Sequence, residues 1–356
     1  MRFPGFEGEW ENKRIGDIGK FFSGGTPSSS RKDFYGGEIP FIRSGEIHSD
    51  KTELFLTQEG YKNSSAKMVE VGDILLALYG ANSGDISISQ MRGAINQAIL
   101  CIRTNVAPVF FKSVWEKHAQ KILNTYLQGG QGNLSADIVK KITISIPSQI
   151  EQAKIAALFS HLDERISIQN KVIEKYESLI KALAHEIIGK NAPNTMLSEC
   201  VCCTSSTLKE SDLSDAGAVP AYGAAGISGF TDNALSAGDS LLITKDGSGV
   251  GSLRYVSGPH SFVGTMNSMT PRDGFYLPYI YYALHNVSFE TYRTGQAIPH
   301  IYFRDYGKER IFCPGYLDQK RIAIGLERIE SKMLIERYFK EHLLSVKAYL
   351  LNALFI

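Results

Sequence analysis

The sequence of 356 residues has no apolar run of the roughly 18–20 residues that a membrane-spanning helix needs. Its first ten residues, MRFPGFEGEW, lack the apolar segment of a secretory signal. Lysine and arginine number 38 against 37 acidic residues, so a uniformly basic nucleic-acid binder is not indicated, although separate basic patches are compatible with this balance. The five cysteines, an odd number, indicate reduced thiols. We therefore expect a cytoplasmic protein that does not associate with membranes.

Motifs for metals and nucleotides are missing as well. Cys200, Cys202 and Cys203 cluster, but no second Cys/His pair follows at zinc-finger spacing, and the eight histidines form no H-x-x-x-H pair. The glycine-rich run DGSGVGS at 246–252 lacks the G-K-[ST] element that binds a nucleoside triphosphate. We interpret this run as a turn between strands. The sequence therefore predicts no metal or cofactor bound by this chain.

What the chain does contain is an internal repeat. Gly72-Asp73 corresponds to Gly238-Asp239, 166 positions later, and the run that begins at residue 125 is matched by the run that begins at residue 291. Both of those runs begin with Thr-Tyr, pass through a Gly/Gln-rich turn, a short β-rich segment and a proline, and end in a long charged helix. A period this long indicates duplication of a whole unit, a globular domain followed by a helix, and not a solenoid.

The globular parts read as a mixture of strands and helices. Short apolar or alternating runs such as DILLALYG and DSLLITKDG lie between turn residues and predict strands. Residues 108–127 and 277–293 predict helices. We expect an α+β fold in which two similar mixed α/β domains, 1–147 and 190–314, are separated by two long helices, 148–189 and 315–356.

The first long helix begins after Pro147, where Ser148 and Glu151 match a capping box. Apolar residues then recur at steps of three and four, a coiled-coil pattern that requires a partner helix. Some 40 residues of helix span about 60 Å. The predicted seam consists of Ile155, Phe159, Leu162, Ile166, Gln169, Ile173, Tyr176, Ile180, Leu183 and Ile187.

The second long helix offers the partner seam. That seam begins with Ile322, Leu326, Ile329 and Met333, and the pattern predicts a shift of register to Phe339, Leu343, Val346, Leu350 and Ala353. We expect the two helices to pack as an antiparallel coiled-coil spacer with internal pseudo-two-fold symmetry. The alternative is two surface helices, each packed on its own domain. A paired-helix spacer between two similar domains suits the recognition of two half-sites at a fixed spacing on double-stranded DNA.

The order of motifs resembles the specificity (S) subunit of type I restriction–modification enzymes. The matching elements of the first copy are FFSGGTPSSS, GEIPFIRSGEI, VGDILLALYGANSGDI, GAINQAIL and GGQGNLSADIVKKITISIPSQIEQAKIAALFSHLDERI, and those of the second are GQAIPHIYFRDY and IFCPGYLDQKRIAIGLERIESK. The resemblance implies that each globular domain is a target recognition domain for one half of a bipartite DNA site. It also implies that the helices set the spacing and dock two modification (methylase) subunits.

The same resemblance implies that catalysis belongs to other chains. S-adenosylmethionine is expected on the methylase subunits, and ATP and Mg on the restriction subunits. In agreement, this sequence has no Asn/Asp-Pro-Pro-Tyr element such as adenine methylases use. We also expect that a fragment of residues 1–189, left without its partner helix, forms a homodimer with a palindromic DNA target.

Candidate DNA contacts are polar and basic residues on the predicted loops, because amides suit adenine, arginine and lysine suit guanine, and hydroxyls suit phosphates. The first copy supplies Arg43, Ser44, Tyr79, Asn82, Ser83, Arg92, Asn96, Gln97, Gln131 and Asn133. The second copy supplies Tyr222, Lys245, Ser248, Arg254, Asn267, Gln296, His300 and Tyr302. The alternative for each is a solvated turn residue. For Asn96 and Gln97 it is a buried pair that satisfies strand-end backbone groups, and for His300 a structural role or a phosphate contact.

Two other classes of function remain open at this point. A bivalent scaffold for proteins or glycans, without DNA, is compatible with the neutral net charge. A nuclease would need a carboxylate cluster, but the repeated Asp73 and Asp239 lie in turns, where aspartate commonly caps the local backbone.

Overall fold

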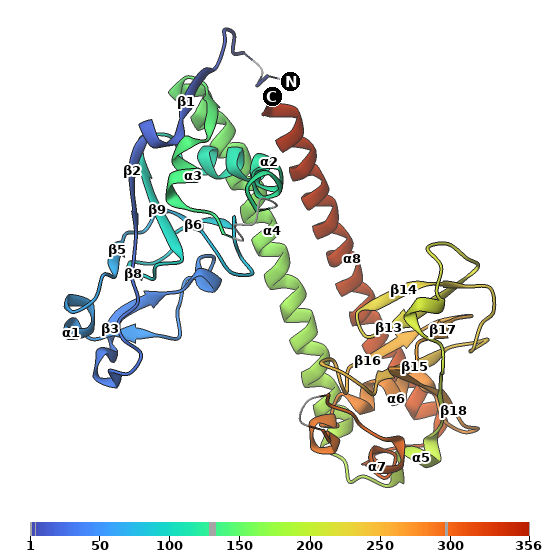
Figure 1. Ribbon diagram of the computed structural model, residues 1–356. Helices are drawn as coiled ribbons and strands as arrows, with labels where there is room; N and C mark the ends of the chain where they lie inside the picture. The colour runs from blue at the N-terminus through green and yellow to red at the C-terminus, as the bar shows by residue number, and fades with distance from the viewer. Residues whose placement is uncertain (1, 4, 128–132, 296–297, 356) are drawn as a thin grey trace. The chain divides into compact units, whose positions relative to one another are not determined.

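The computed structural model describes residues 2–3, 5–127, 133–295 and 298–355 (Figure 1). The chain forms two compact units. Unit 1 consists of residues 1–169 together with 339–356, and unit 2 consists of residues 170–338. The two long helices, α4 (Gln149–Ala184) and α8 (Tyr316–Leu354), contribute to both units, so the division falls inside the helices and not at their ends.

Unit 1 contains two four-stranded sheets and a two-stranded ribbon. The first sheet has the order β2-β9-β6-β7 and is antiparallel, whereas in the second, β4-β3-β8-β5, strands β3 and β8 run parallel. The ribbon pairs β1 with β10. The strands are β1 (Glu11–Arg14), β2 (Gly19–Ser23), β3 (Tyr35–Ile42), β4 (Phe55–Leu56), β5 (Lys67–Val69), β6 (Ile74–Ala77), β7 (Ile86–Ile88), β8 (Gly93–Ile95), β9 (Ile99–Thr104) and β10 (Thr143–Ile146).

Unit 2 repeats this topology, except that none of its described strands corresponds to β5. Its sheets are β12-β18-β15-β16 and β14-β13-β17, with β13 and β17 parallel, and its ribbon pairs β11 with β19. The strands are β11 (Thr195–Met196), β12 (Val201–Ser205), β13 (Val219–Gly223), β14 (Gly226–Thr231), β15 (Ser240–Thr244), β16 (Leu253–Val256), β17 (Ser261–Phe262), β18 (Met266–Pro271) and β19 (Arg310–Ile311). The predicted internal repeat and the mixed α/β character of both domains are confirmed.

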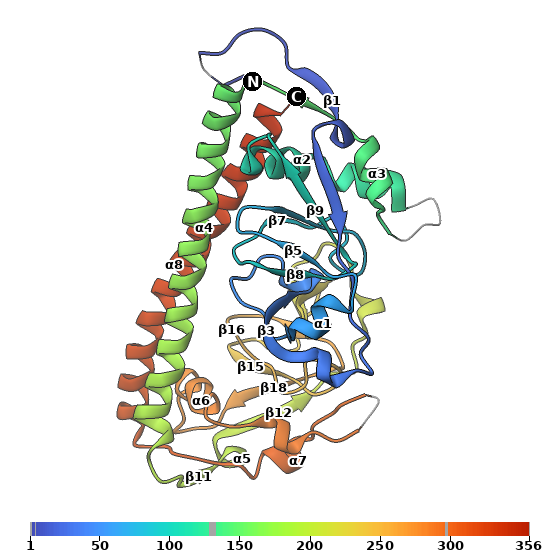
Figure 2. The same cartoon turned by 90° about the vertical axis from the view of Figure 1, so that its left-hand side faces the viewer.

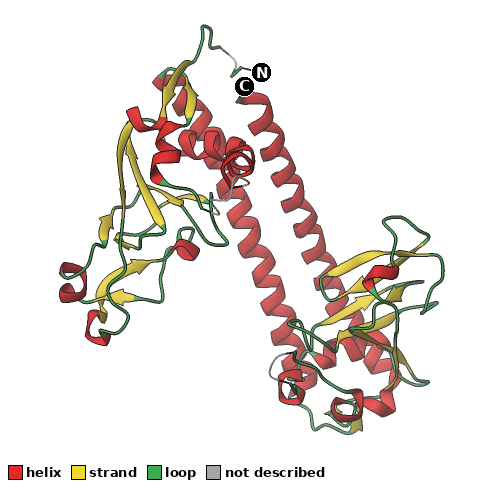
Figure 3. Ribbon diagram, in the orientation of Figure 1, coloured by secondary structure: helices red, strands yellow, loops and turns green. Residues whose placement is uncertain are grey.

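One helix in each unit covers the antiparallel sheet. In unit 1, α2 (Pro108–Leu127) spans the predicted range and buries Phe110 and Trp115 against the sheet, with the indole N–H donating to the Gly84 carbonyl at 2.8 Å. In unit 2, α6 (Leu277–Leu284) is shorter than the predicted 277–293. The Asn286 amide donates to the carbonyl of Ala283, an end group of the helix, and the chain turns there (Figure 3).

Shorter helices complete the units. Unit 1 has α1 (Gln58–Lys62) and α3 (Ala136–Lys141), and unit 2 has α5 (Leu197–Cys200) and α7 (Phe303–Tyr306). None of the described helices combines the length and the apolar character that crossing a bilayer requires.

The start of α4 packs against the end of α8 in unit 1, and the end of α4 packs against the start of α8 in unit 2, so the helices run antiparallel (Figures 1 and 2). The predicted seam residues are mostly turned inward. Ile155, Phe159, Gln169, Ile173, Ile180, Leu326, Met333 and Leu343 are buried, and Leu162, Ile166, Tyr176, Leu183, Ile322, Ile329, Val346, Leu350 and Ala353 are half-buried.

Two seam predictions are corrected by the structure. Ile187 is 39% exposed, because the helix widens into a π-turn at His185–Gly189 and Ile188 takes the inward position instead. Phe339 is 42% exposed, because α8 does not shift register. Its inward face continues at steps of three and four through polar residues that the apolar pattern had skipped, namely Glu336, Lys340 and Lys347, all half-buried.

Lys347 has charged partners that explain its place on the inward face. Its Nζ lies 2.8 Å from Glu116 on α2 and 2.8 Å from Asp163 on α4. Lys112 Nζ lies 2.5 Å from the same Asp163 and 3.2 Å from Glu116. Burial raises the pKa of Asp163, but the two ammonium groups outweigh it and hold this pKa below its usual value. A network of four charges thus joins three helices of unit 1.

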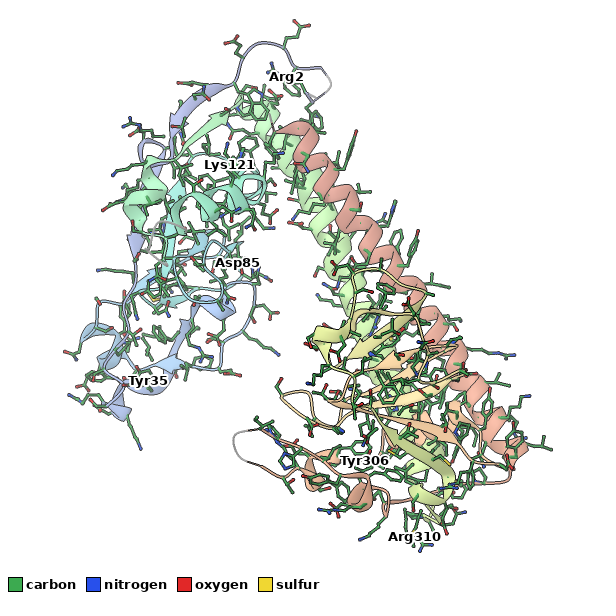
Figure 4. All side chains as sticks on the ribbon, turned by 45° about the vertical axis from the view of Figure 1, so that its right-hand side comes forward. Arg2, Tyr35, Asp85, Lys121, Tyr306 and Arg310 are labelled. Carbon is green, nitrogen blue, oxygen red and sulfur yellow. The ribbon has the colours of Figure 1, made fainter. Side chains whose placement is uncertain are left out.

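The long helices start in the same way. Ser148 accepts the Glu151 N–H at 3.3 Å, as a helix cap should, but the Glu151 carboxylate binds Arg2 at 2.8 Å and does not complete the predicted capping box (Arg2 is labelled in Figure 4). One turn into α4, the buried Gln152 amide accepts the Ala107 N–H and donates to the Pro147 carbonyl. Gln319 in α8 makes the corresponding bonds to the Tyr276 N–H and the Pro314 carbonyl.

Candidate nucleic-acid interface

Three loops of unit 1 meet at the ends of strands β3, β6 and β8. The Asn96 N–H donates to the Ile42 carbonyl at 3.3 Å, and the Leu78 N–H donates to the Ala98 carbonyl at 2.8 Å. The Leu78 carbonyl in turn accepts the Leu134 N–H at 2.9 Å. We call residues 43–50, 78–85, 96–98 and 133–134 loop cluster 1.

The side chains that loop cluster 1 exposes are mainly polar and uncharged. Asn82, Gln97 and Asn133 are exposed, while Ser44 and Tyr79 are half-buried. A Cβ added at Gly45 would lie 3.6 Å from the Asn82 amide, which places the first two loops in contact. Burial raises the pKa of the Tyr79 hydroxyl, so this phenol stays a neutral donor. The cluster presents amide and hydroxyl groups of the kind that meet base edges and phosphates.

Arg43 belongs to loop cluster 1, but its guanidinium is hydrogen-bonded to two carboxylates. It donates to Glu46 Oε1 at 2.8 Å and to Glu53 Oε2 at 3.1 Å. Its hydrogen bonds lower the pKa of Glu46 to about 2 and outweigh the opposing effect of burial. Contact of Arg43 with DNA stays a prediction, and it would require this ion pair to open.

Two further predicted contacts are occupied by the backbone. The Ser83 hydroxyl donates to the Leu78 carbonyl at 2.9 Å, and the side-chain oxygen Oδ1 of Asn96 accepts the Ala98 N–H at 3.1 Å. For Asn96 this is the alternative role of satisfying strand-end backbone groups. These two side chains shape the loops that present their neighbours.

Arg92 lies away from loop cluster 1. It precedes β8, whereas the cluster follows that strand, and its Nε lies 3.1 Å from Glu70 Oε1 in the turn before β6. The structure therefore does not bring Arg92 together with the other predicted contacts. Gln131 and Gln296 lie outside the described residues.

A further segment, not predicted from the sequence, borders this cluster. Gly24 and Gly25 pass so close to Ile95 and Ser65 that a Cβ at either glycine would overlap them, at 1.8 and 1.9 Å. Next to them, the Thr26 hydroxyl donates to Gln97 Oε1 and fixes the orientation of that amide. The motif FFSGGTPSSS carried the signal, because paired glycines often mark a close backbone approach.

A histidine–aspartate pair also lies in this cluster. His48 Nε2 is 2.8 Å from Asp85 Oδ2, and the Gln90 amide donates to the His48 carbonyl at 2.7 Å. Asp85 lies between β6 and β7 (labelled in Figure 4). These contacts brace the first loop of the cluster against the second.

Unit 2 builds the same arrangement with other side chains. The Lys245 N–H donates to the Thr265 carbonyl and its carbonyl accepts the Ile301 N–H, both at 2.9 Å, as at Leu78 in unit 1. The Tyr222 carbonyl accepts the Val263 N–H at 2.9 Å. We call residues 222–226, 245–252, 263–265 and 298–302 loop cluster 2. Gly84 and Gly251, 167 positions apart, hold the same left-handed turn, with φ of 87° and 86°.

Arg254, on the edge strand β16, borders loop cluster 2 and is exposed. Its guanidinium nitrogens lie 3.8 and 3.9 Å from the Cβ position of Gly226, and its Cζ lies 6.0 Å from the centre of the Tyr222 ring. Within the described part of the chain no carboxylate forms an ion pair with Arg254. This guanidinium therefore keeps its hydrogen-bonding fork available, unlike that of Arg43.

The other predicted residues of unit 2 divide into surface and interior. Ser248 and Tyr302 are exposed, Lys245 is half-buried, and the half-buried His300 ring packs on that of Tyr302 at 5.3 Å. Asn267 is only 4% exposed. It lies in β18, accepts the Ser205 hydroxyl at 2.8 Å and donates to the Tyr306 hydroxyl at 3.2 Å. Burial in a central strand removes Asn267 from any surface that meets a base.

A nuclease would need a cluster of side chains that binds a metal ion. Among the described residues, no group of three or more His, Cys, Asp or Glu side chains is placed to hold one. Asp73 and Asp239, the repeated aspartates, serve as turn and side-chain acceptors. Asp73 accepts from Arg103 at 2.6 Å, and Asp239 accepts from the Tyr255 hydroxyl at 2.6 Å. Their contacts fit the structural role in turns.

Comparison with known proteins links this architecture to one family. The family described as "Type I restriction modification DNA specificity domain" matches residues 7–178. The chain is 29% identical over 184 residues to the type I restriction enzyme MjaIX specificity subunit of Methanocaldococcus jannaschii, covering 47% of this chain and 41% of that protein. It is 28% identical over 187 residues to the HindI specificity subunit of Haemophilus influenzae, covering 48% and 40%. The match thus spans less than half of either relative.

Solved structures match the fold over nearly the whole chain. The S subunit of a type I restriction–modification system from M. genitalium superposes with a TM-score of 0.63 at 16% identity, covering 98% of this chain and 96% of that one. A second structure, from work on assembly and conformational transition of the type I system, gives a TM-score of 0.51 at 16% identity, covering 97% of each chain. At this identity the likeness concerns the fold alone.

Proposed function

We propose that this chain selects the DNA sequence at which a type I restriction–modification complex acts. The proposal starts from the match of residues 7–178 to the family of type I restriction modification DNA specificity domains. The observation that carries the proposal is the repeated loop cluster. Both units join three loops at the ends of corresponding strands by the same backbone hydrogen bonds. Each cluster serves as the reading surface for one half of a bipartite site.

The side chains differ where the backbone is the same. Counting from the shared hydrogen bonds, Gln97 corresponds to Gly264, and Asn133 corresponds to His300. Such a difference on a common scaffold favours two unlike half-sites and hence an asymmetric target. A scaffold for proteins or glycans, the other candidate, does not explain the match to DNA specificity domains.

The chemistry of the exposed groups suggests which bases each unit prefers. In unit 1, Gln97, oriented by Thr26, and Asn82 offer the paired donor and acceptor that recognise adenine. In unit 2, Arg254 offers the fork that recognises guanine O6 and N7. Lys245, Ser248 and the loop N–H groups suit phosphate contacts, which position the protein without reading sequence.

Docking of the methylase subunits is assigned to the outward faces of the long helices. Large aliphatic residues stay more than half exposed at corresponding positions of both helices, Ile150 with Leu317 and Ile168 with Ile335. In each helix the two residues are 18 positions, or five turns, apart and therefore lie on one face. Repetition of the same exposed residues favours two equivalent sites, one for each of two copies of the same partner.

The chain itself has no catalytic role in this proposal. S-adenosylmethionine is held by the methylase subunits, and ATP and Mg by the restriction subunits that join the complex. The purified chain should therefore transfer no methyl group and cut no DNA alone. Methyl transfer by the chain without its partners would contradict this division of labour.

The decisive experiment is to map methylated sites in cells that express the methylase with variants of this chain. Gln97→Ala should relax the first half of the site only, and Arg254→Ala the second half only, each by about 1–3 kcal/mol of discrimination. Arg92→Ala is the matched control, because that exposed arginine lies outside loop cluster 1. Unchanged methylation in the first two variants, or equal relaxation of both halves, would contradict the proposal.

Measuring duplex binding by the assembled complex distinguishes a DNA specificity subunit from a scaffold for proteins or glycans. Neutralisation of several phosphates makes binding fall steeply as salt rises. Binding that is insensitive to salt and to the sequence of the duplex would favour the scaffold instead.

The docking sites need their own test. Ile168→Glu and Ile335→Glu should each weaken binding of one methylase copy, measured by mass in solution, and the double variant should lose both. Leu334→Glu, a change at an exposed leucine about 100° around α8 from Ile335, is the control. If both variants still bind two methylase copies normally, the outward faces are not the docking sites.

A further inference from the structure

Two of the five cysteines lie side by side in unit 2. The sulfur atoms of Cys200 and Cys313 are 3.7 Å apart, although 113 positions separate them in the chain. Cys200 is the last residue of α5 and is buried. Cys313 lies between β19 and α8 and is half-buried. The pair thus connects the beginning of the recognition domain with the segment that leads into the long helix.

The backbone on both sides of this pair is fixed. The Cys313 N–H donates to Asn194 Oδ1 at 2.8 Å, and the Asn194 amide donates back to the Cys313 carbonyl at 2.9 Å. The Cys200 carbonyl accepts the Arg272 N–H at 2.9 Å. A disulfide needs the sulfurs about 2.05 Å apart, so the two sulfur atoms must move closer together before a bond forms.

The two thiols differ in reactivity. The contact with Cys200 lowers the pKa of Cys313, against the effect of its burial, and Thr195 adds to the lowering. The same thiol–thiol contact raises the pKa of Cys200, together with its burial. Cys313 is also the more exposed of the two. Cys313 is therefore the thiol that reacts first with an oxidant, as the thiolate, and Cys200 reacts in the second step.

We propose that Cys200 and Cys313 form a reversible thiol–disulfide modification site that a peroxide oxidises. The Cys313 thiolate attacks one oxygen of hydrogen peroxide, the O–O bond breaks, and the products are a sulfenic acid on Cys313 and, after protonation, one water. The Cys200 thiol then attacks the sulfenic sulfur, the S–O bond breaks, and the second water leaves with the Cys200 proton. The two thiols lose two electrons, which reduce the peroxide.

The other three cysteines lack this arrangement. Burial raises the pKa of Cys101 to about 12 and that of Cys203 to about 11, and the Cys203 sulfur faces the Tyr306 hydroxyl at 3.9 Å. In the described ranges no hydrogen bond joins Cys101, Cys202 or Cys203 to another cysteine. Oxidation is therefore expected to be specific for one pair.

The test uses the purified full-length chain and hydrogen peroxide at a small molar excess. Free thiols, counted with a chromogenic disulfide, should fall from five to three, and a reductant should restore them. Mass mapping without reduction should find the Cys200 and Cys313 peptides joined. The disulfide should also raise the thermal midpoint of unfolding, because it closes a long loop.

Variants separate this site from unspecific oxidation. Cys200→Ser should abolish the crosslink and leave a sulfenic acid on Cys313 that a cyclic diketone traps. Cys202→Ser, a change next to the site, should form the crosslink as the wild-type chain does. Five thiols that persist in peroxide, or oxidation of Cys313 in the wild-type chain without a bond to Cys200, would overturn the proposal.

Discussion

The buried amide of Gln152 offers a sharp test of how unit 1 is attached to its long helix. Oε1 accepts the Ala107 N–H at 3.1 Å, directly before α2, and Nε2 donates to the Pro147 carbonyl at 2.9 Å. Gln152→Leu keeps the size of the side chain but leaves this N–H and this carbonyl without their partner. Each buried polar group left unpaired costs about 1–3 kcal/mol, and the leucine recovers part of that by burying apolar surface. We expect unit 1 to lose ~2–4 kcal/mol of stability.

The assay follows from the placement of the tryptophans. Both of them, Trp10 and Trp115, belong to unit 1, so tryptophan fluorescence during urea or thermal unfolding reports on this unit. A loss of this size lowers the midpoint of a unit this large by roughly 4–16 °C. The control is Gln149→Leu, an exposed glutamine one turn earlier. If both variants unfold at the same midpoint, the buried amide does not hold the domain to its helix.

Three further predictions concern charge and assembly. Because the folded pKa of Glu46 is about 2, against a usual 4.5, its stabilising contribution is complete above pH 4.5 and is lost as pH falls towards 2. Glu46→Gln should therefore reduce the dependence of the urea midpoint on pH over this window. An unchanged dependence would speak against the ion pair with Arg43. Lys347→Met should lower the free energy of unfolding by about 1–3 kcal/mol, because it removes one cation from Asp163 and Glu116. Lys154→Met, an exposed control, should change the urea midpoint little. Equal midpoints for the two variants would show that the network contributes nothing to stability. A fragment of residues 1–189 should form a homodimer that directs methylation to a palindromic site, and a monomer in solution, or methylation of the original asymmetric site, would refute the antiparallel pairing of two first helices.

Regular periodicity explains what the sequence could predict. The three-four spacing of apolar residues identified Phe159, Ile173 and Leu326 as inward-facing, because a paired helix buries one narrow stripe. The repeat predicted two domains of one topology, and the strand orders of the two units agree except for the edge strand β5, which has no counterpart among the described strands of unit 2. Local patterns of this kind lie within a few turns or strands and need no knowledge of distant contacts.

Contacts between distant residues explain what the sequence could not predict. Lys347 appears as a solvated residue in the pattern, and only the carboxylates of Glu116 and Asp163, far away in the chain, make its inward position stable. Arg43 is of a residue type that reads bases, but its guanidinium donates to the Glu53 carboxylate. Asn267 follows a loop in the sequence yet lies in a central strand between Ser205 and Tyr306. Each of these three side chains is polar and has a partner from another element.

The discontinuity of unit 1 has a consequence for the order in which the protein matures on the ribosome. Unit 2 is one continuous stretch of chain, whereas unit 1 receives its last helix only after unit 2 has been made. Trp10, Phe110 and Phe159 pack on the ring of Phe355, at 6.0, 5.5 and 5.7 Å. Translation at about 5–20 residues per second separates Phe159 from Phe355 by roughly 10–40 s. The second half of the chain therefore completes its fold first, and throughout that interval the nascent first half presents an aromatic surface to chaperones.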